Sequence, residues 1–170
     1  ISGGQDRQIR VWRRDGAGFV AAPPLEVTLR GDTHFVQFSP KGERVVIAGN
    51  DGAVIAWSVS DGVVDPTSRR VLAQHTGAVT ALAFAAAGTW VASAGRDAKV
   101  LRSDRAGPPV EAVLPAAAIA LALDDEGGIH AVTRAGAVVR WTAGHAVIEI
   151  DHGARTAVRL PGNRWALALD

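Results

Sequence analysis

Three residues whose side chains could form a hydrolytic site lie within a short part of the chain. His75, Ser93 and Asp97 supply an imidazole, a hydroxyl and a carboxylate, and these are the three groups of a Ser-His-Asp triad. A triad is defined by its geometry and by the role of each group, which spacing in the sequence does not supply. The elements that carry the three residues therefore decide whether they are catalytic.

The stretch that contains Ser93 and Asp97 recurs along the chain. Each copy has a short apolar run, a turn of small residues and an alternating run that normally ends in Trp. The four copies are SGGQDRQIRVW (2–12), IAGNDGAVIAW (47–57), SAGRDAKVLRS (93–103) and AVTRAGAVVRW (131–141). Their last residues are separated by 45, 46 and 38 positions. A period of about 40 residues with several short strands per unit is typical of β-propeller blades.

The units resemble WD repeats. The resemblance is carried by the corner Phe38-Ser39-Pro40, by second runs that end in Ser-Gly or Ser-Ala-Gly, by the turn Asp and by the final Trp. It implies an all-β fold, a β-propeller of four-stranded antiparallel blades, with residues 1–170 forming a single propeller segment. We expect three complete blades and two partial terminal blades, at 1–30 (partial), 31–75, 76–115, 116–151 and 152–170 (partial).

The same resemblance implies a structural role for the His, Ser and Asp residues. In WD repeats the His before the inner strand, the Ser of the second strand and the turn Asp form a buried hydrogen-bond network, which the Trp of the third strand completes. A buried polar group without a partner costs about 1–3 kcal/mol, so such a network stabilises its blade. The residues assigned to it are Asp6, Trp12, Asp51, Trp57, His75, Ser93, Asp97 and Trp141.

The network is incomplete in every copy. Ser103 stands where Trp is expected, Ile47 replaces Ser in the preceding copy, and the last copy has Ala131 and Ala135 in place of Ser and Asp. We expect these departures to leave the fold intact and to make the blades unequal in stability.

Composition excludes several classes of function. The formal net charge is +1 and no long run has one sign, so the basic footprint of a nucleic-acid or acidic-membrane binder is missing. Without Cys there is no disulfide and no thiolate zinc site, and we expect no cofactor or metal. A chain without Cys fits a reducing compartment, hence the expectation of a cytoplasmic protein. Abundant Ala, Gly, Val and Arg suggest a GC-rich bacterial genome, and the absence of Met suggests part of a larger polypeptide.

One acidic stretch could be read as a cation site. Asp124, Asp125 and Glu126 follow one another at a turn between two expected strands. A calcium loop needs further oxygen ligands at set offsets, and none follows here. We interpret this stretch as a solvated turn.

The turns between second and third strands remain as candidates for binding. Gln5, Asn50, Arg96 and Arg134 each lie one residue before the turn Asp or its substitute, and His34 lies near the start of an inner strand. Arg is enriched at binding hot spots. The resemblance implies a non-catalytic scaffold or sensor module that binds a peptide or protein at these channel-mouth loops.

The alternative is a propeller enzyme, a hydrolase or lyase with a metal at the same channel mouth. Such a site needs several inward carboxylates or histidines, whereas the starts of the inner strands carry His34, Thr80 and mostly Ala or Val. A metal-content assay would separate the two hypotheses, because a stoichiometric calcium or zinc ion favours the enzyme.

Overall fold

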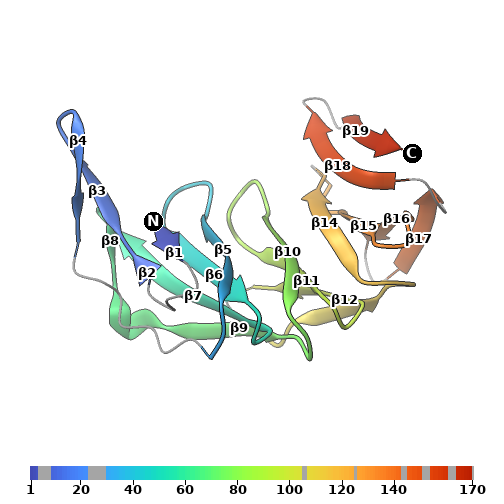
Figure 1. The fold of residues 1–170 in the computed structure, drawn as a ribbon, viewed down its shortest axis with the longest axis horizontal. Coiled ribbons are helices and arrows are strands. Elements are labelled where there is room, and N and C mark those ends of the chain that lie inside the picture. The colour runs from blue at the N-terminus through green and yellow to red at the C-terminus, as the bar shows by residue number, and fades with distance from the viewer. Residues whose placement is uncertain are drawn as a thin grey trace.

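The computed structural model consists of short antiparallel strands arranged in successive sheets (Figure 1). It describes residues 1–3, 9–22, 30–104, 107–124 and 126–142, together with the backbone of strands 145–150, 154–160 and 164–169. The prediction of an all-β fold is confirmed. Within these residues the one helical element is the 3₁₀ turn η1 (Pro66–Ser68), and no helix is long and apolar enough to cross a membrane.

Three sheets contain most of the strands, and we call them sheets I, II and III. Sheet I is formed by β5 (Thr33–Phe38), β6 (Arg44–Gly49), β7 (Ala53–Ser60), β8 (Val63–Val64) and β9 (Arg70–Gln74). Sheet II has the order β10 (Val79–Phe84), β11 (Val91–Gly95), β12 (Lys99–Ser103) and β13 (Val110–Val113). Sheet III has the order β14 (Ala118–Leu123), β15 (Ile129–Thr133), β16 (Val138–Thr142) and β17 (His145–Ile150).

Shorter sheets flank these three. On the N-terminal side β1 (Ser2–Gly3) pairs with β2 (Ile9–Arg10), and β3 (Trp12–Asp15) pairs with β4 (Gly18–Ala21). On the C-terminal side β18 (Ala154–Leu160) pairs with β19 (Arg164–Leu169). The expected outer strand over residues 19–29 is seen only as β4, because residues 23–29 lie outside the described part of the chain.

The first strands of successive sheets follow one another along one side of an arc. Figure 1 shows β5, β10, β14 and β18 in this order, each leading into a sheet that extends away from that side. The Thr80 hydroxyl of β10 donates a hydrogen bond to the carbonyl oxygen of Ala118 in β14, at 2.6 Å. Sheets II and III are therefore joined at their first strands, which are the inner strands of the arc.

The hydrophobic core lies between the sheets. Successive side chains of a strand point to opposite faces, so in β6 Val45 and Ile47 pack toward the N-terminal strands, and Val46 and Ala48 pack toward sheet II. Every residue of β6 is buried. A third apolar cluster, which includes Trp90 and Trp141, joins sheets II and III. Strands covered on both faces are nearly continuous apolar runs for this reason.

Candidate functional site

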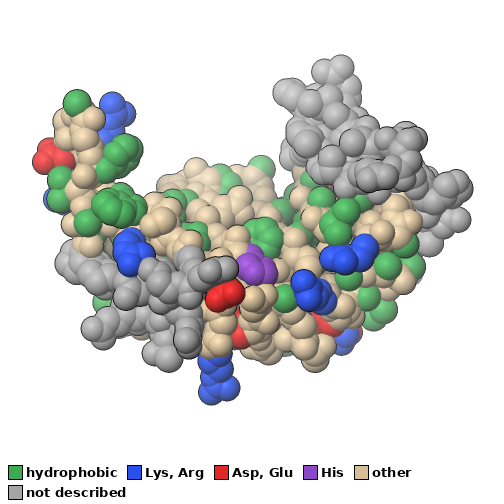
Figure 2. Space-filling model, viewed as in Figure 1, with side chains coloured by type: hydrophobic (Ala, Val, Ile, Leu, Met, Phe, Trp, Pro, Cys, Tyr) green, Lys and Arg blue, Asp and Glu red, His purple; other side chains and the backbone are tan. Residues whose placement is uncertain are grey.

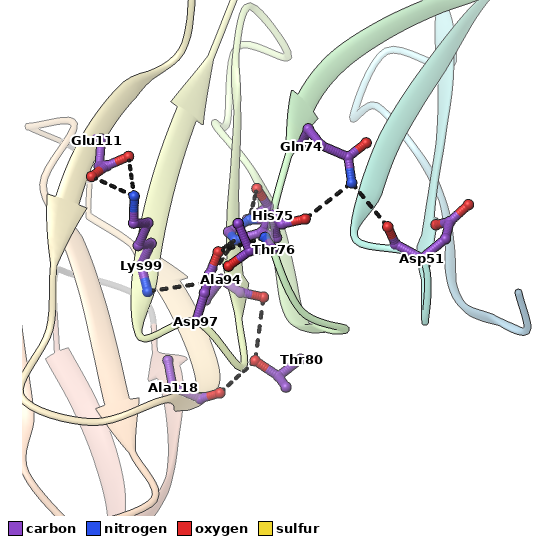
Figure 3. Close-up of polar contacts among 11 residues, drawn as sticks. Asp51, Gln74, His75, Thr76, Thr80, Ala94, Asp97, Lys99, Glu111 and Ala118 are labelled. Carbon is purple, nitrogen blue, oxygen red and sulfur yellow. Dashed lines mark hydrogen bonds and ion pairs between the residues drawn. The ribbon is translucent and has the colours of Figure 1, made fainter. Parts of the chain in front are cut away.

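His75, Ser93 and Asp97 are brought together in sheet II. His75 lies between β9 and β10, Ser93 in β11 and Asp97 in the turn before β12. His75 Nδ1 is 3.0 Å from Asp97 Oδ1, and His75 Nε2 is 2.9 Å from Ser93 Oγ. Figure 3 shows the Asp97 carboxylate among His75, Thr76 and Lys99. The imidazole thus bridges the hydroxyl and the carboxylate.

Hydrogen bonds to Asp97 stabilise its charged form. Burial by itself would raise the pKa of this carboxyl, but contacts with His75 and with the backbone N–H groups of Thr76 and Lys99 outweigh it and hold the pKa below the usual value. These N–H groups lie 3.0 and 3.2 Å from the carboxylate. The carboxylate therefore anchors the entry to β10 and the start of β12.

Burial decides what this arrangement can do. Ser93 is 0% exposed and His75 is 2% exposed. A nucleophile must contact a substrate carbonyl, and a hydroxyl covered on all sides does not reach one. The contacts are those of a triad, whereas the surroundings are those of a hydrogen-bond network inside a sheet.

The equivalent turns in sheets I and III use other residues for the same backbone contacts. Asp51 accepts hydrogen bonds from the N–H groups of Ala53, at 3.1 Å, and Arg30, at 3.4 Å. In sheet III the hydroxyl of Thr133 accepts from the N–H of Ala137 at 3.0 Å. The sequence analysis missed Thr133, although a hydroxyl residue at the end of a strand whose turn lacks Asp is a signal for it.

The three Trp residues assigned to the network lie in different environments. Trp57 is 2% exposed and belongs to the core between the N-terminal strands and sheet I. Trp141 is 6% exposed and belongs to the core between sheets II and III. Trp12 is 44% exposed, so the prediction that it is buried is wrong. Its indole N–H still donates to Ser2 Oγ, at 3.1 Å. Among the described strands β3 and β4 pair only with each other, which leaves Trp12 less covered than Trp57. The Asp6 assigned to the same copy lies outside the described residues.

Asn50, Arg96 and Arg134 occupy equivalent positions on one rim of the sheets. The backbone N–H of each donates to the carbonyl of a residue at the entry to the inner strand of its sheet, namely Asp32, Ala78 and Ala117, at 3.0, 2.9 and 2.8 Å. All three side chains are exposed. We call these residues the rim; Gln5, the fourth predicted member, lies outside the described residues.

A bulge lies at the start of each inner strand beside the rim. The strand register shifts by one residue at this point in β5, β10 and β14. A bulge turns its extra side chain in a new direction. The extra residues are His34, which is exposed, Thr80, which is hydrogen-bonded, and Ile119, which is 39% exposed.

The acidic turn after β14 contains a buried cluster that the sequence analysis did not predict. The side chain of Asp124 is 1% exposed, so its interpretation as a solvated residue is wrong; Asp125 lies outside the described residues. His130 Nε2 lies 3.1 Å from Asp124 Oδ2, and the Gly128 N–H donates to Asp124 Oδ1 at 2.6 Å. Arg140 donates to both Asp124 and the exposed Glu126. His130 and Arg140 are direct cross-strand partners, which strand register could have revealed.

The other arginines at this end of the sheets are also engaged. Arg44 Nη2 donates to the carbonyl of Gly88, which joins sheet I to the β10–β11 turn. The guanidinium of Arg102 lies 4.5 Å from the centre of the Trp90 ring, in a cation–π contact. In the described part of the chain, no group of three His, Asp or Glu side chains could hold a metal ion.

Comparison with known proteins identifies the repeat. Residues 66–101 match the family model "WD domain, G-beta repeat". The match begins at η1 of sheet I and ends in β12 of sheet II, and it includes His75, Ser93 and Asp97. The sequence repeat therefore extends from the outer part of one sheet into the next, which links consecutive sheets covalently.

The proteins similar to this chain include two mammalian proteins and a solved structure. Cilia- and flagella-associated protein 52 of Sus scrofa is 29% identical over 103 residues, which are 60% of this chain and 16% of that protein. WD repeat and FYVE domain-containing protein 1 of Bos taurus is 29% identical over 98 residues, 57% of this chain and 23% of that protein. This chain thus spans less than a quarter of either relative.

The solved structure shows the fold. The β-propeller domain of Cps50 (Swd1) from Myceliophteria thermophila superposes with a TM-score of 0.57 at 22% identity, covering 69% of this chain and 38% of that one. The sheets described above thus have the arrangement of propeller blades. The chain carries a WD repeat at residues 66–101, and its fold is that of a WD-repeat β-propeller.

Proposed function

We propose that this chain is a rigid, non-catalytic platform that binds a protein or peptide segment at the rim, with His34 beside it. The observation that carries the proposal is the repeated rim geometry. One backbone hydrogen bond per sheet holds Asn50, Arg96 and Arg134 in equivalent positions, and each side chain is exposed. Loops on a rigid scaffold that differ in residue type are typical of binding surfaces.

Two further observations favour binding over catalysis. His75 and Ser93 are buried inside the fold, so a substrate cannot reach the Ser93 hydroxyl. WD-repeat propellers such as those matched here typically act as protein-interaction scaffolds. We further propose that the blades have the limits predicted from the sequence. The cytoplasmic location and the larger parent polypeptide remain predictions from the sequence.

This function is tested in two steps. Displayed random peptides are first selected on the folded chain, and amide hydrogen exchange of the chain is then measured with and without a selected peptide. We expect slower exchange in the turns at 50–52, 96–98 and 134–136 and at the start of β5. Protection along the outer strands β9 or β13 would instead place the partner on a sheet edge and contradict the proposal.

A further inference from the structure

We infer that the part of the rim formed by sheets II and III binds an acidic peptide segment, whose carboxylates pair with Arg96 and Arg134. This inference rests on the proposed function, since it names the chemistry of the partner for the same surface. It depends on how the two guanidinium groups differ from the other charged groups of the described chain.

The guanidinium groups of Arg96 and Arg134 have no acidic partner among the described residues. Both side chains are exposed. Asp97, the residue after Arg96, is already used by His75 and by the backbone of Thr76 and Lys99. Arg140 and Lys99, in contrast, pair with Asp124 and Glu111. The two rim arginines can therefore pair with an external carboxylate without breaking an internal contact.

The two arginines lie at the same end of neighbouring sheets. Arg96 is tied to Ala78 at the entry to β10, and Arg134 is tied to Ala117 at the entry to β14. The Thr80 hydroxyl bonds these two inner strands together through the Ala118 carbonyl. Ile119, at the bulge of β14, adds exposed apolar surface at this end. An extended peptide crossing from sheet II to sheet III would meet both charges.

The rim of sheet I has a different charge. Asn50 replaces Arg there, and its amide nitrogen lies 3.4 Å from the carboxylate of Asp32. Asp51 adds a second carboxylate on this rim. The turn of sheet I thus carries carboxylates close to the exposed Arg30, whereas Arg96 and Arg134 have no acidic partner among the described residues. The acidic part of a peptide would therefore lie over sheets II and III.

The distribution of basic groups favours a peptide over a nucleic acid. Figure 2 shows Lys and Arg side chains as separate groups on the face drawn, with acidic side chains among them. The formal net charge is only +1. Nucleic-acid binding normally requires a continuous basic surface that follows the phosphates.

The test selects peptides on the wild-type chain and then compares their affinity for the wild type with their affinity for charge variants. Displayed short random peptides are selected on the wild-type chain at low salt, and the enriched sequences are synthesised with a fluorescent label. Anisotropy titrations then use wild type, Arg96→Glu, Arg134→Glu and a matched control, Lys41→Glu. Lys41 is exposed in the turn after β5, at the opposite end of the strands from the rim.

We expect the selected peptides to be enriched in Asp and Glu. Each rim substitution should weaken their binding by about ten-fold or more, because it replaces a charge-assisted contact with repulsion. Added salt should weaken binding to wild type. Lys41→Glu should have little effect, and circular dichroism should show that all variants remain folded. The double variant Arg96→Glu/Arg134→Glu should instead select Lys- and Arg-rich peptides.

The possible failures are distinguishable. Peptides without acidic enrichment that still lose affinity on rim substitution would overturn the acidic partner and leave the proposed function standing. Peptides that bind all variants equally would overturn this inference, and the proposed function would then stand only if amide exchange slowed in the turn at 50–52 or at the start of β5. No enrichment at all would overturn both. A labelled single-stranded oligonucleotide serves as a further probe. If it binds the wild type more tightly than the selected peptides do, and if the rim substitutions abolish this binding, the surface is assigned to nucleic acid.

Discussion

Arg140 donates two hydrogen bonds to one carboxylate oxygen of Asp124, from Nε at 3.2 Å and from Nη2 at 2.8 Å. Asp124 is almost completely buried, whereas the Arg140 side chain is 31% exposed. The guanidinium therefore compensates a buried negative charge while keeping part of its surface in water. This contact joins the β14–β15 turn to β16 and makes the stability of sheet III sensitive to pH.

The pH dependence follows from the pKa of Asp124. Burial would raise it, but hydrogen bonds from Arg140, Gly128 and His130 lower it from 3.8 to about 2. A carboxyl with a lower pKa in the folded state stabilises the fold above its unfolded pKa, and this contribution is lost as pH falls from about 4 through about 2. We expect the loss to be about 2 kcal/mol.

Urea titrations at a series of acidic pH values would measure this effect in wild type and in Asp124→Asn. The variant should be less stable at neutral pH and should lose less stability on acidification. Free energies of unfolding that fall in parallel for the two chains would contradict the role of Asp124.

Removal of the guanidinium should destabilise the fold more than removal of its exposed partner. Arg140→Met leaves the buried Asp124 charge without its main counter-charge, and we expect a loss of about 2 kcal/mol. Glu126→Ala is the matched control, because the Glu126 side chain is 73% exposed and such pairs contribute below about 1 kcal/mol. Equal thermal midpoints for the two variants would show that the pair is energetically unimportant.

Asp97→Ala should destabilise the chain by about 1–3 kcal/mol, because it leaves His75 Nδ1 and two backbone N–H groups without their acceptor. Asp51→Ala removes the equivalent acceptor from sheet I, where the contacts are with the backbone of Ala53 and Arg30. We expect a smaller loss there, of about 1 kcal/mol. Chemical denaturation would compare the two, and an unchanged unfolding midpoint for Asp97→Ala would rule out the network as a source of stability.

Gly95→Ala should be strongly destabilising for a steric reason. A Cβ at this position would lie 2.6 Å from His75 Nδ1 and 2.7 Å from Asp97 Oδ1, so the buried network would have to move. The cost should reach about 1–3 kcal/mol. At Gly107 a Cβ meets no atom of the described residues within 4 Å, so Gly107→Ala should keep the thermal midpoint of wild type. A midpoint for Gly95→Ala that matches the control would show that the network has room to relax.

Ser103→Ala should leave stability unchanged or raise it by about 1 kcal/mol. Ser103 stands where the repeat normally has Trp, is 1% exposed, and its hydroxyl has no hydrogen-bond partner within the described part of the chain. Removal of a buried unpaired hydroxyl removes its desolvation cost. A clear fall in the free energy of unfolding, measured by urea titration, would show that the hydroxyl is satisfied in solution.

Much of the architecture could be predicted because it is encoded locally. The alternation of Val45, Val46, Ile47 and Ala48 predicts a strand buried on both faces, and the spacing of the Trp-terminated copies predicts a repeated sheet. The positions of His75, Ser93 and Asp97 relative to strands and turns also follow from the repeat. These features depend on strand periodicity and turn residues, which a sequence displays directly.

Other features were decided by contacts between segments distant in the sequence. Asp124 is buried because His130 and Arg140 meet it across β14, β15 and β16, whereas its own acidic stretch indicates a solvated turn. Trp12 is exposed, unlike Trp57, because burial depends on which strands cover a residue rather than on its place in the repeat. The sequence by itself thus determined the strands, the turns and the fold. The tertiary structure decided which polar groups are buried together and which rim charges have no acidic partner among the described residues, because burial and pairing depend on neighbouring strands and sheets.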